Sequence, residues 1–254
     1  MQLTDIVGGK GVPFGKLTVY PITVRYYEEF SENKMCLTLM QKKFGIEMAS
    51  MPYLRMLLYL STENVNLMAM LSKILSLSLH IDENCIRVTM QENGKISLLF
   101  LDGTDDNANI IETVTELRFS ALRRLIAELN DVTLPNEQAN LEILESEEDI
   151  AKANSVNLNV DFKSLFFSVA VACRLSTAEM LDMTIFEFEE RVSAISRTLK
   201  FQMYGQGEMS GFVSFKGGNP YPSWCFDKSE SGLHGAIPLD SFKQRVGNVV
   251  EEKT

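Results

Sequence analysis

The feature that most constrains the fold is a stripe of apolar residues, spaced three or four apart, in the second half of the chain. The stripe consists of Ile185, Phe188, Val192, Ile195, Leu199 and Met203. This spacing places the six side chains on one face of an α-helix. Thr184 and Glu187 match the first and last positions of a capping box, which marks where a helix begins. The sequence therefore predicts a long amphipathic helix from residue 185 to residue 203.

Two shorter helices are predicted before this one. Asp161 stands just before an apolar segment, residues 162–174, and its carboxylate suits the N-cap position. Ser176 and Glu179 form another capping box, which opens a second short helix. We therefore expect the second half of the chain to be mainly helical.

The first half mixes strand and helix signals. Residues 17–20 and 22–24 are rich in β-branched and aromatic side chains, which predicts short strands, and Pro21 between them indicates a sheet edge. Asn93-Gly94 stands between two further runs of this kind. Such a pair is a strong hairpin signal, and the runs cover residues 85–90 and 95–101.

Three helices are also predicted in the first half, over residues 53–60, 65–79 and 116–130. Pro52 can open the first, with Ser50 nearby as its cap. Ser61 or Thr62 can cap the second and Thr115 the third. The second helix is apolar on almost every side, which favours a buried position over a partner surface. On the third, we expect Arg118, Arg123 and Arg124 to lie on the side away from the apolar face.

An acidic segment separates the two halves. Residues 136–149 carry six acidic side chains and no basic one. Such a run is typical of a solvated linker or helix face. The sequence therefore predicts an α+β fold with an α+β domain over residues 1–130 that contains the hairpin. An acidic linker follows over residues 131–155, and then a helical domain with an irregular aromatic tail over residues 156–254.

Charge and cysteine usage narrow the function classes. The 254 residues carry a formal net charge of −10, which argues against a general nucleic-acid binder, because phosphate contacts need clustered Lys and Arg. The four cysteines form no C-x-x-C pair and three have apolar neighbours, so we expect reduced thiols and a cytoplasmic protein. The N-terminus does not resemble a secretory signal. The most apolar stretch, residues 65–79, is too short and too polar to cross a membrane.

No catalytic, cofactor or metal site is predicted. The two histidines, His80 and His234, lie near no recognisable nucleophile motif, and the dispersed His and Cys lack zinc spacing. Glycine-rich residues 8–11 lack the phosphate-loop pattern, and the spacing of the glycines at 205–211 does not match a dinucleotide site. The loop at residues 102–107 has three carboxylates but not the calcium-loop order.

Aromatic side chains are the remaining candidates for function. Two neighbouring predicted helices are crowded with phenylalanines, namely Phe162, Phe166, Phe167, Phe186 and Phe188, and Phe186 lies off the main stripe. They could be the core between the two helices or a groove for a partner helix rimmed by acids, and core is favoured. Trp224, in a proline-containing aromatic tail, carries the same ambiguity, because such tails often anchor on another subunit. The predicted partner-binding set consists of Phe166, Phe186, Phe188 and Trp224, and homo-oligomerisation is left open.

Several segments together resemble proteins encoded in the tail-assembly region of bacteriophages and of phage-derived particles of Gram-positive bacteria, some of which are regarded as tail assembly chaperones. The segments are Val19–Ile22 followed by Tyr26-Tyr27, the helix 117–130 leading into LPNEQANLEILESEEDI, and LSTAEMLDMTIFEFEERVSAISRTLKFQMYGQGEMSGFVSFK with a Pro and a Trp after it. The resemblance implies a non-enzymatic role in the bacterial host cytoplasm.

The partner implied by this resemblance is another phage tail protein, either the tape-measure protein or a baseplate component, which a chaperone would shield before assembly. A structural subunit of the tail or baseplate is the closer alternative. An enzyme of unrecognised type is the more distant one. The resemblance carries no functional residue onto this sequence.

Overall fold

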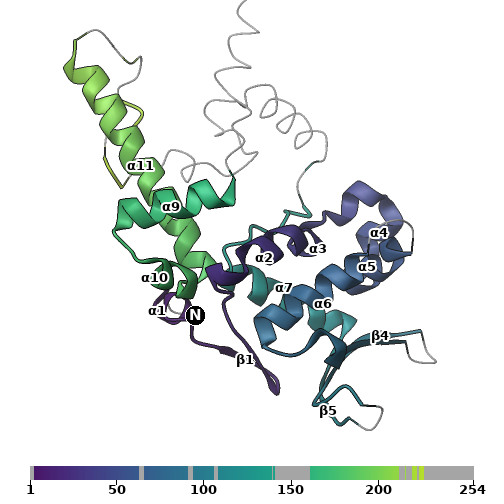
Figure 1. Cartoon of the computed structure of the whole chain (residues 1–254). Helices are drawn as coiled ribbons and strands as arrows, with labels where there is room; N and C mark the ends of the chain where they lie inside the picture. The colour runs from purple at the N-terminus through teal and green to yellow at the C-terminus, as the bar shows by residue number, and fades with distance from the viewer. Residues whose placement is uncertain are drawn as a thin grey trace, which may run out of the picture. The chain divides into compact units, whose positions relative to one another are not determined.

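The structure, a computed structural model, describes residues 3–62, 66–90, 94–105, 108–138, 140, 161–211, 215, 219–221 and 223–225. Its helices and two small antiparallel sheets form an α+β fold, as predicted (Figure 1). The chain divides into two compact units. Unit 1 consists of Met1–Glu137 and Val160–Val192, and unit 2 of Gln138–Asn159 and Ser193–Thr254.

This division differs from the domains expected from the sequence. The predicted helical domain began at residue 156, whereas the segment Val160–Val192 groups with the N-terminal part of the chain. The acidic linker was predicted over residues 131–155, and most of it, residues 141–155, lies outside the described residues.

Most of unit 1 is helical. Its α-helices are α1 (Leu3–Val7), α2 (Tyr27–Asn33), α3 (Met35–Thr38), α4 (Ile46–Ser50), α5 (Tyr53–Ser61), α6 (Leu67–Leu79), α7 (Glu116–Leu129), α9 (Phe162–Cys173), α10 (Thr177–Asp182) and the beginning of α11 (Ile185–Met209). Short 3-10 helices are η1 (Val24–Tyr26), η2 (Gln41–Phe44) and η3 (Glu83–Cys85).

Two antiparallel sheets complete unit 1. The strands β1 (Val12–Phe14) and β2 (Leu17–Val19) form one sheet. The second sheet contains β3 (Ile86–Met90), β4 (Ile96–Leu101) and β5 (Ile110–Thr115), with β4 in the middle. The predicted hairpin is confirmed by the pairing of β3 with β4, although Asn93 of its turn lies outside the described residues. Gly94 has a φ of +74°, a conformation that glycine adopts freely.

The apolar helix α6 lies in the core of unit 1, as expected from its composition. It packs against α2, α3, α5 and β2, and the side chains of Leu71, Ile74 and Leu75 are buried. Phe100 of β4 and Phe119 of α7 belong to the same hydrophobic cluster. Burial of a side chain of this size contributes about 1.5–3 kcal/mol, so this cluster dominates the stability of unit 1.

Several predicted caps are confirmed. The Asp161 carboxylate accepts a hydrogen bond from the Ser164 backbone N–H at 2.7 Å, which caps α9. Ser176 and Glu179 form both bonds of a capping box at α10. The Thr115 hydroxyl accepts from the third backbone N–H beyond it and caps α7. These contacts are local in sequence, which is why the residue pattern predicts them.

Two caps were predicted wrongly. Ser50 does not cap α5, because its hydroxyl donates to a carbonyl inside α4, and Pro52 itself occupies the N-cap position of α5. At α6 the capping side chain is Asn66. Ser61 still contributes there, since its hydroxyl accepts from the Met68 backbone N–H at 3.1 Å.

The strand predictions were partly wrong. Residues 17–19 form β2, but the strand expected at 22–24 is absent: Val24 begins η1, and Thr23 forms only an isolated β-bridge with Thr184. The strands β1 and β5 were not predicted, although β5 has the β-branched composition of a strand. Helix α11 also continues through Gly205 and Gly207 to Met209, beyond the predicted end at residue 203.

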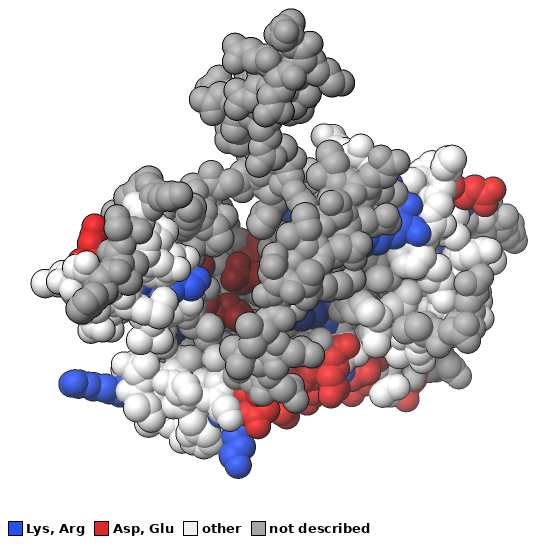
Figure 2. Space-filling view, turned by 90° about the horizontal axis from the view of Figure 1, so that it is seen from above, with Lys and Arg blue, Asp and Glu red and all other residues white. Residues whose placement is uncertain are grey.

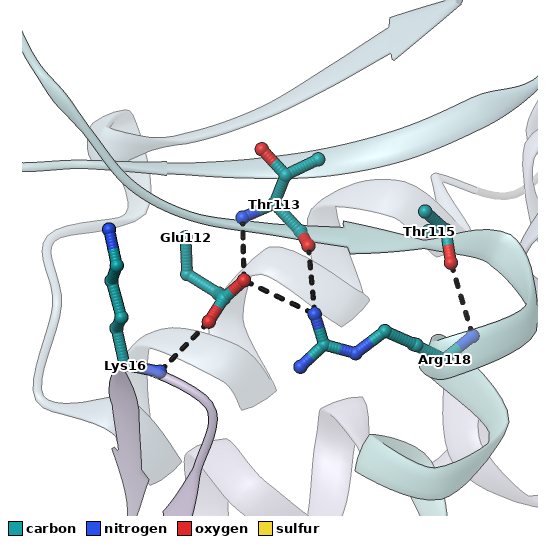
Figure 3. A network of polar contacts seen from close by, with 5 residues as sticks. All are labelled: Lys16, Glu112, Thr113, Thr115 and Arg118. Atoms are coloured by element: carbon teal, nitrogen blue, oxygen red, sulfur yellow. Dashed lines mark hydrogen bonds and ion pairs between the residues drawn. The ribbon is translucent and has the colours of Figure 1, made fainter.

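A polar network joins the β1–β2 turn to β5 and α7 (Figure 3). The Glu112 carboxylate accepts hydrogen bonds from the Lys16 backbone N–H at 2.8 Å and from the Arg118 guanidinium at 3.2 Å. The Lys16 N–H is the largest cause that lowers the pKa of Glu112. Because the pKa of Glu112 is lowered, the network stabilises the fold fully at pH values above the usual pKa of a carboxyl group. This contribution is lost as the pH falls through the lowered pKa.

In unit 2, aromatic residues after α11 return to the helix. The ring of Tyr204 lies 5.3 Å from that of Phe215 and 5.1 Å from that of Tyr221. The Asn219 amide donates to the Glu208 carboxylate at 2.9 Å. The described part of the tail therefore covers the face of α11 that carries positions 204 and 208. Within the described residues, no helix has both the length and the hydropathy that a membrane crossing requires.

Replacing Gly15 with alanine is expected to destabilise the protein by more than the ~1–2 kcal/mol that the left-handed conformation costs an L-residue. Gly15 has a φ of +64°, and an added methyl would also collide with the Glu112 carboxylate. Urea denaturation measures the loss. Gly94→Ala is the matched control, because its φ is similar and nothing lies within 4 Å of the added methyl. Equal losses in the two variants would contradict the role of the Glu112 contact.

Candidate protein-binding surface

Two of the predicted partner-binding residues lie in the interior of unit 1. Phe188 is fully buried and Phe166 is 7% exposed. Phe162 joins them: its ring meets each of theirs edge to face, at 6.1 Å for Phe188 and 5.9 Å for Phe166. Phe166 and Phe188 therefore belong to the core, which the sequence analysis favoured over a groove for a partner helix.

Tyr27 holds this aromatic cluster to α2. Its ring stacks on Phe162 at 4.4 Å and meets Phe188 edge to face at 5.5 Å. Its hydroxyl donates to the Glu189 carboxylate at 2.8 Å. Burial is the largest cause that raises the pKa of Tyr27, and the bond to Glu189 raises it further, so the phenol stays protonated and acts as a donor.

The other two predicted residues occupy different surroundings. Phe186 is half-buried and packs against the hydrophobic core of unit 1. Trp224 is 65% exposed and belongs to unit 2. The structure therefore brings Phe166 and Phe188 together with Phe162, and it leaves Trp224 as the predicted residue that is open to solvent.

The exposed apolar side chains of α9 lie outside the predicted partner-binding set, although Phe167 belongs to the crowded phenylalanines of the sequence analysis. Phe167 is 50% exposed and Val171 is 78% exposed. They are four residues apart, so they lie one above the other on one face of the helix. Phe166 and Val169 of the same helix are buried, and the ring of Phe167 meets that of Phe166 edge to face at 5.3 Å. Apolar residues occur on all sides of the helix predicted over residues 162–174, and this was the available signal. It did not reveal which face of the helix would be covered.

Exposed apolar side chains also occur on the part of α11 that belongs to unit 2. Leu199 and Met203 are four residues apart and both are more than half exposed. The aromatic tail residue Tyr221 packs on a different face, near Tyr204 and under the Lys200 ammonium. Within the described part of unit 2, Leu199, Met203 and Trp224 are therefore available as apolar contacts.

Arg123 was expected on the exposed side of α7, and this was wrong. Its side chain is buried, its Nε donates to the Leu37 carbonyl at 2.7 Å, and its guanidinium lies 3.5 Å from the centre of the Tyr53 ring. Burial lowers the pKa of Arg123. One of its amino groups, Nη2, and Oε2 of Glu137 are buried without a hydrogen-bond partner. A guanidinium is weakly hydrated and stacks on aromatic faces, which explains how α7 accommodates it in the core.

His80 and Cys36 are held in structural positions. His80 takes the left-handed C-cap position of α6 and stacks on Tyr20 at 4.5 Å, and His234 lies outside the described residues. Cys36 is fully buried, and burial raises the pKa of its thiol to about 12. Among the described residues, no group of three His, Cys, Asp or Glu side chains could hold a metal ion.

Charged side chains of both signs share the surface. On the face drawn in Figure 2, Lys and Arg of the described residues lie at several separate places, whereas Asp and Glu gather in a larger patch in the lower part of the view. Several ion pairs are spread over unit 1, such as that between Lys73 and both Glu29 and Glu83, at 2.7 and 3.2 Å. Exposed pairs of this kind contribute about 0–1 kcal/mol each.

Comparison with known proteins gives no relative: no family model, no curated protein and no solved structure matches the chain.

We expect Phe188→Ala to destabilise the protein by about 3–5 kcal/mol, because it would leave a cavity beside Tyr27 and Phe162 in the core. Phe186→Ala should cost less, about 1–2 kcal/mol, because Phe186 is only half-buried. Chemical denaturation of both variants gives the comparison. If Phe186→Ala were the more damaging change, the assignment of Phe188 to the core would be wrong.

Thiol reactivity gives an independent check on burial. At pH 8 we expect a disulfide reagent to modify the exposed Cys225 first, and Cys36 and Cys85 only after unfolding. Cys225→Ser should remove the fastest phase of the reaction.

The pH dependence of stability is a second consequence of burial. Since burial raises the pKa of Cys36 from 9.0 to about 12, the contribution of this thiol to stability is full below pH 9 and is lost as the pH rises towards 12. Rapid reaction of all four thiols in the folded protein would contradict the burial of Cys36 and Cys85.

Proposed function

We propose that the chain is a non-enzymatic phage tail assembly protein that binds another tail protein, the tape-measure protein or a baseplate component, as a chaperone. The observation that carries the proposal is the apolar face of α9 formed by Phe167 and Val171. These side chains lie on the outside of a helix whose other face already supplies the core of unit 1. The resemblance of the sequence to tail-assembly-region proteins supplies the identity of the partner.

An exposed apolar pair one helical turn apart suits binding of an amphipathic helix. Partner helices of this kind present anchors at positions i, i+3, i+4 and i+7. Phe167 offers a large rigid ring, and Val171 extends the contact by one turn. Because both side chains are already ordered on a helix, binding would cost less side-chain entropy than binding by a flexible loop. A tape-measure protein is largely long helix, so it would present such anchors repeatedly.

The proposed surface is tested with the double variant Phe167→Ala/Val171→Ala. We expect the variant to fold with a small loss of stability, because half of the Phe167 side chain is covered and its ring contacts Phe166. We also expect a loss of client capture of at least tenfold, since aromatic anchors often contribute more than 1.4 kcal/mol. The measurement is pull-down and solubility of the tail proteins encoded beside this chain, co-expressed with each variant. The thermal midpoint of each variant reports folding.

Leu117→Ala is the matched control, because Leu117 is 77% exposed and also lies on a helix, α7. It should leave capture unchanged. If the stably folded wild-type chain captured no tail protein, the chaperone proposal would be abandoned.

A structural subunit of the tail or baseplate remains the alternative proposal, and purified particles separate the two. A chaperone acts before assembly and would be absent from the finished tail, whereas a subunit would remain in it. Mass spectrometry of purified particles, in which the amount of this chain is compared with that of the tail tube protein, decides between the two proposals.

A further inference from the structure

A cavity of about 330 Å³ opens in unit 1 between α2, α3, the end of α7 and the beginning of α11. Its apolar part is formed by Phe30, Val132 and Ile185. Its polar part contains three charged side chains and several hydrogen-bonding ones, namely Lys34, Asp131, Glu189, Thr38, Asn130 and Thr133. The volume lies at the lower end of the range for ligand sites, which suits a small group.

The walls of the cavity are fixed by contacts behind them. Asn130 is buried, and both ends of its amide are used: Oδ1 accepts from the Ile22 backbone N–H and Nδ2 donates to the Ile126 carbonyl, each at 2.8 Å. Oε1 of Glu189 accepts from the Tyr27 hydroxyl at 2.8 Å. The Glu189 carboxylate is therefore held in place before any ligand binds, and this bond does not use its second oxygen.

The charges in the cavity do not neutralise one another in ion pairs. Within the described residues, neither Lys34 nor Asp131 has a salt-bridge partner, although Lys34 is half-buried. Asp131 also has a φ of +53°, a conformation that Asp tolerates better than most residues. With two carboxylates and one ammonium, the cavity has an excess of one negative charge.

We propose that this cavity binds a cationic side chain, an arginine, of a protein partner. The proposal rests on the protein-binding function proposed above, and it adds the chemistry of one anchor. The carboxylates of Asp131 and Glu189 would accept the guanidinium N–H groups, and the hydroxyls of Thr38 and Thr133 would accept further ones. The apolar wall at Phe30 suits the aliphatic stem of the arginine.

Arginine fits this cavity better than lysine. Its planar guanidinium has five donors, which can bond acceptors that lie on different walls, whereas an ammonium is a compact charge with three donors. Arginine is also enriched among the anchors of protein interfaces. The excess negative charge of the cavity would be neutralised by one such side chain.

The test is a titration of the ¹⁵N-labelled full chain with N-acetyl-arginine amide, followed by NMR. We expect concentration-dependent shifts at the backbone amides of Thr38 and residues 130–133, and weakening by added salt. N-acetyl-citrulline amide has the same shape without the charge, and it should bind at least tenfold more weakly. Free arginine is a second probe, which separates a protein side chain from a small-molecule ligand.

Two variants should weaken binding of the arginine probe, and a third should strengthen it. Glu189→Gln keeps the acceptor for Tyr27, and Asp131→Asn keeps a residue that tolerates a positive φ, so both should fold and bind the arginine probe at least threefold more weakly. Lys34→Met should bind it more tightly, because a competing positive charge is removed. Glu32→Gln, an exposed acid of α2 outside the cavity, is the matched control and should have little effect.

Equal binding of the arginine and citrulline probes, or weaker binding by Lys34→Met, would overturn the proposal. Binding of free arginine without binding of the blocked amide would assign the cavity to a small molecule and also overturn it. Capture of a tail protein through Phe167 and Val171 is measured separately. If that capture succeeds while the probes fail, only the arginine site is wrong.

Discussion

The architecture of unit 1 depends on a backbone junction between segments about 160 residues apart. The Val24 N–H donates to the Met183 carbonyl, and the Ile185 N–H donates to the Ile22 carbonyl, both at 2.8 Å. The buried side chain of Asn130 accepts from the Ile22 N–H, so the end of α7 joins the same junction. Each buried backbone group left without a partner would cost about 1–3 kcal/mol. Placing α11 elsewhere would therefore break several bonds at once, and this explains why its first residues group with the N-terminal part of the chain.

The sequence predicts those parts of the fold that are decided by neighbours along the chain. The Asp161 cap, the Ser176 capping box and the β3–β4 hairpin each depend on residues a few positions apart, and each was predicted. The junction could not be predicted in the same way. Residues 22–24 have strand composition, but their partner is a single residue, Thr184, so the pairing ends after one bridge and Val24 enters a 3-10 helix. A distant contact determined the outcome there.

The side chains of the candidate site also depend on contacts that are distant in sequence, and these could not be predicted. Periodicity identified two helices with more apolar residues than one stripe needs, and this surplus is present on α9. It did not show that Tyr27 would stack on Phe162 while Phe167 stays half exposed, because Tyr27 lies on a helix more than 130 residues earlier. Arg123 was misplaced for a related reason. A charged residue is normally exposed, and the Tyr53 ring and the Leu37 carbonyl, both remote in sequence, are contacts that favour its burial.

Tyr27 connects the two features on which the functional proposals rest. Its ring packs against α9, whose outer face carries Phe167, and its hydroxyl orients Glu189 in the wall of the cavity. One rigid side chain thus positions an apolar helix and a carboxylate within the same unit. In the proposed complex these would have different roles. Complementary charges mainly accelerate encounter, whereas a buried aromatic anchor mainly slows dissociation. For a chain with a net charge of −10, a partner with basic anchors would be attracted before any apolar contact forms.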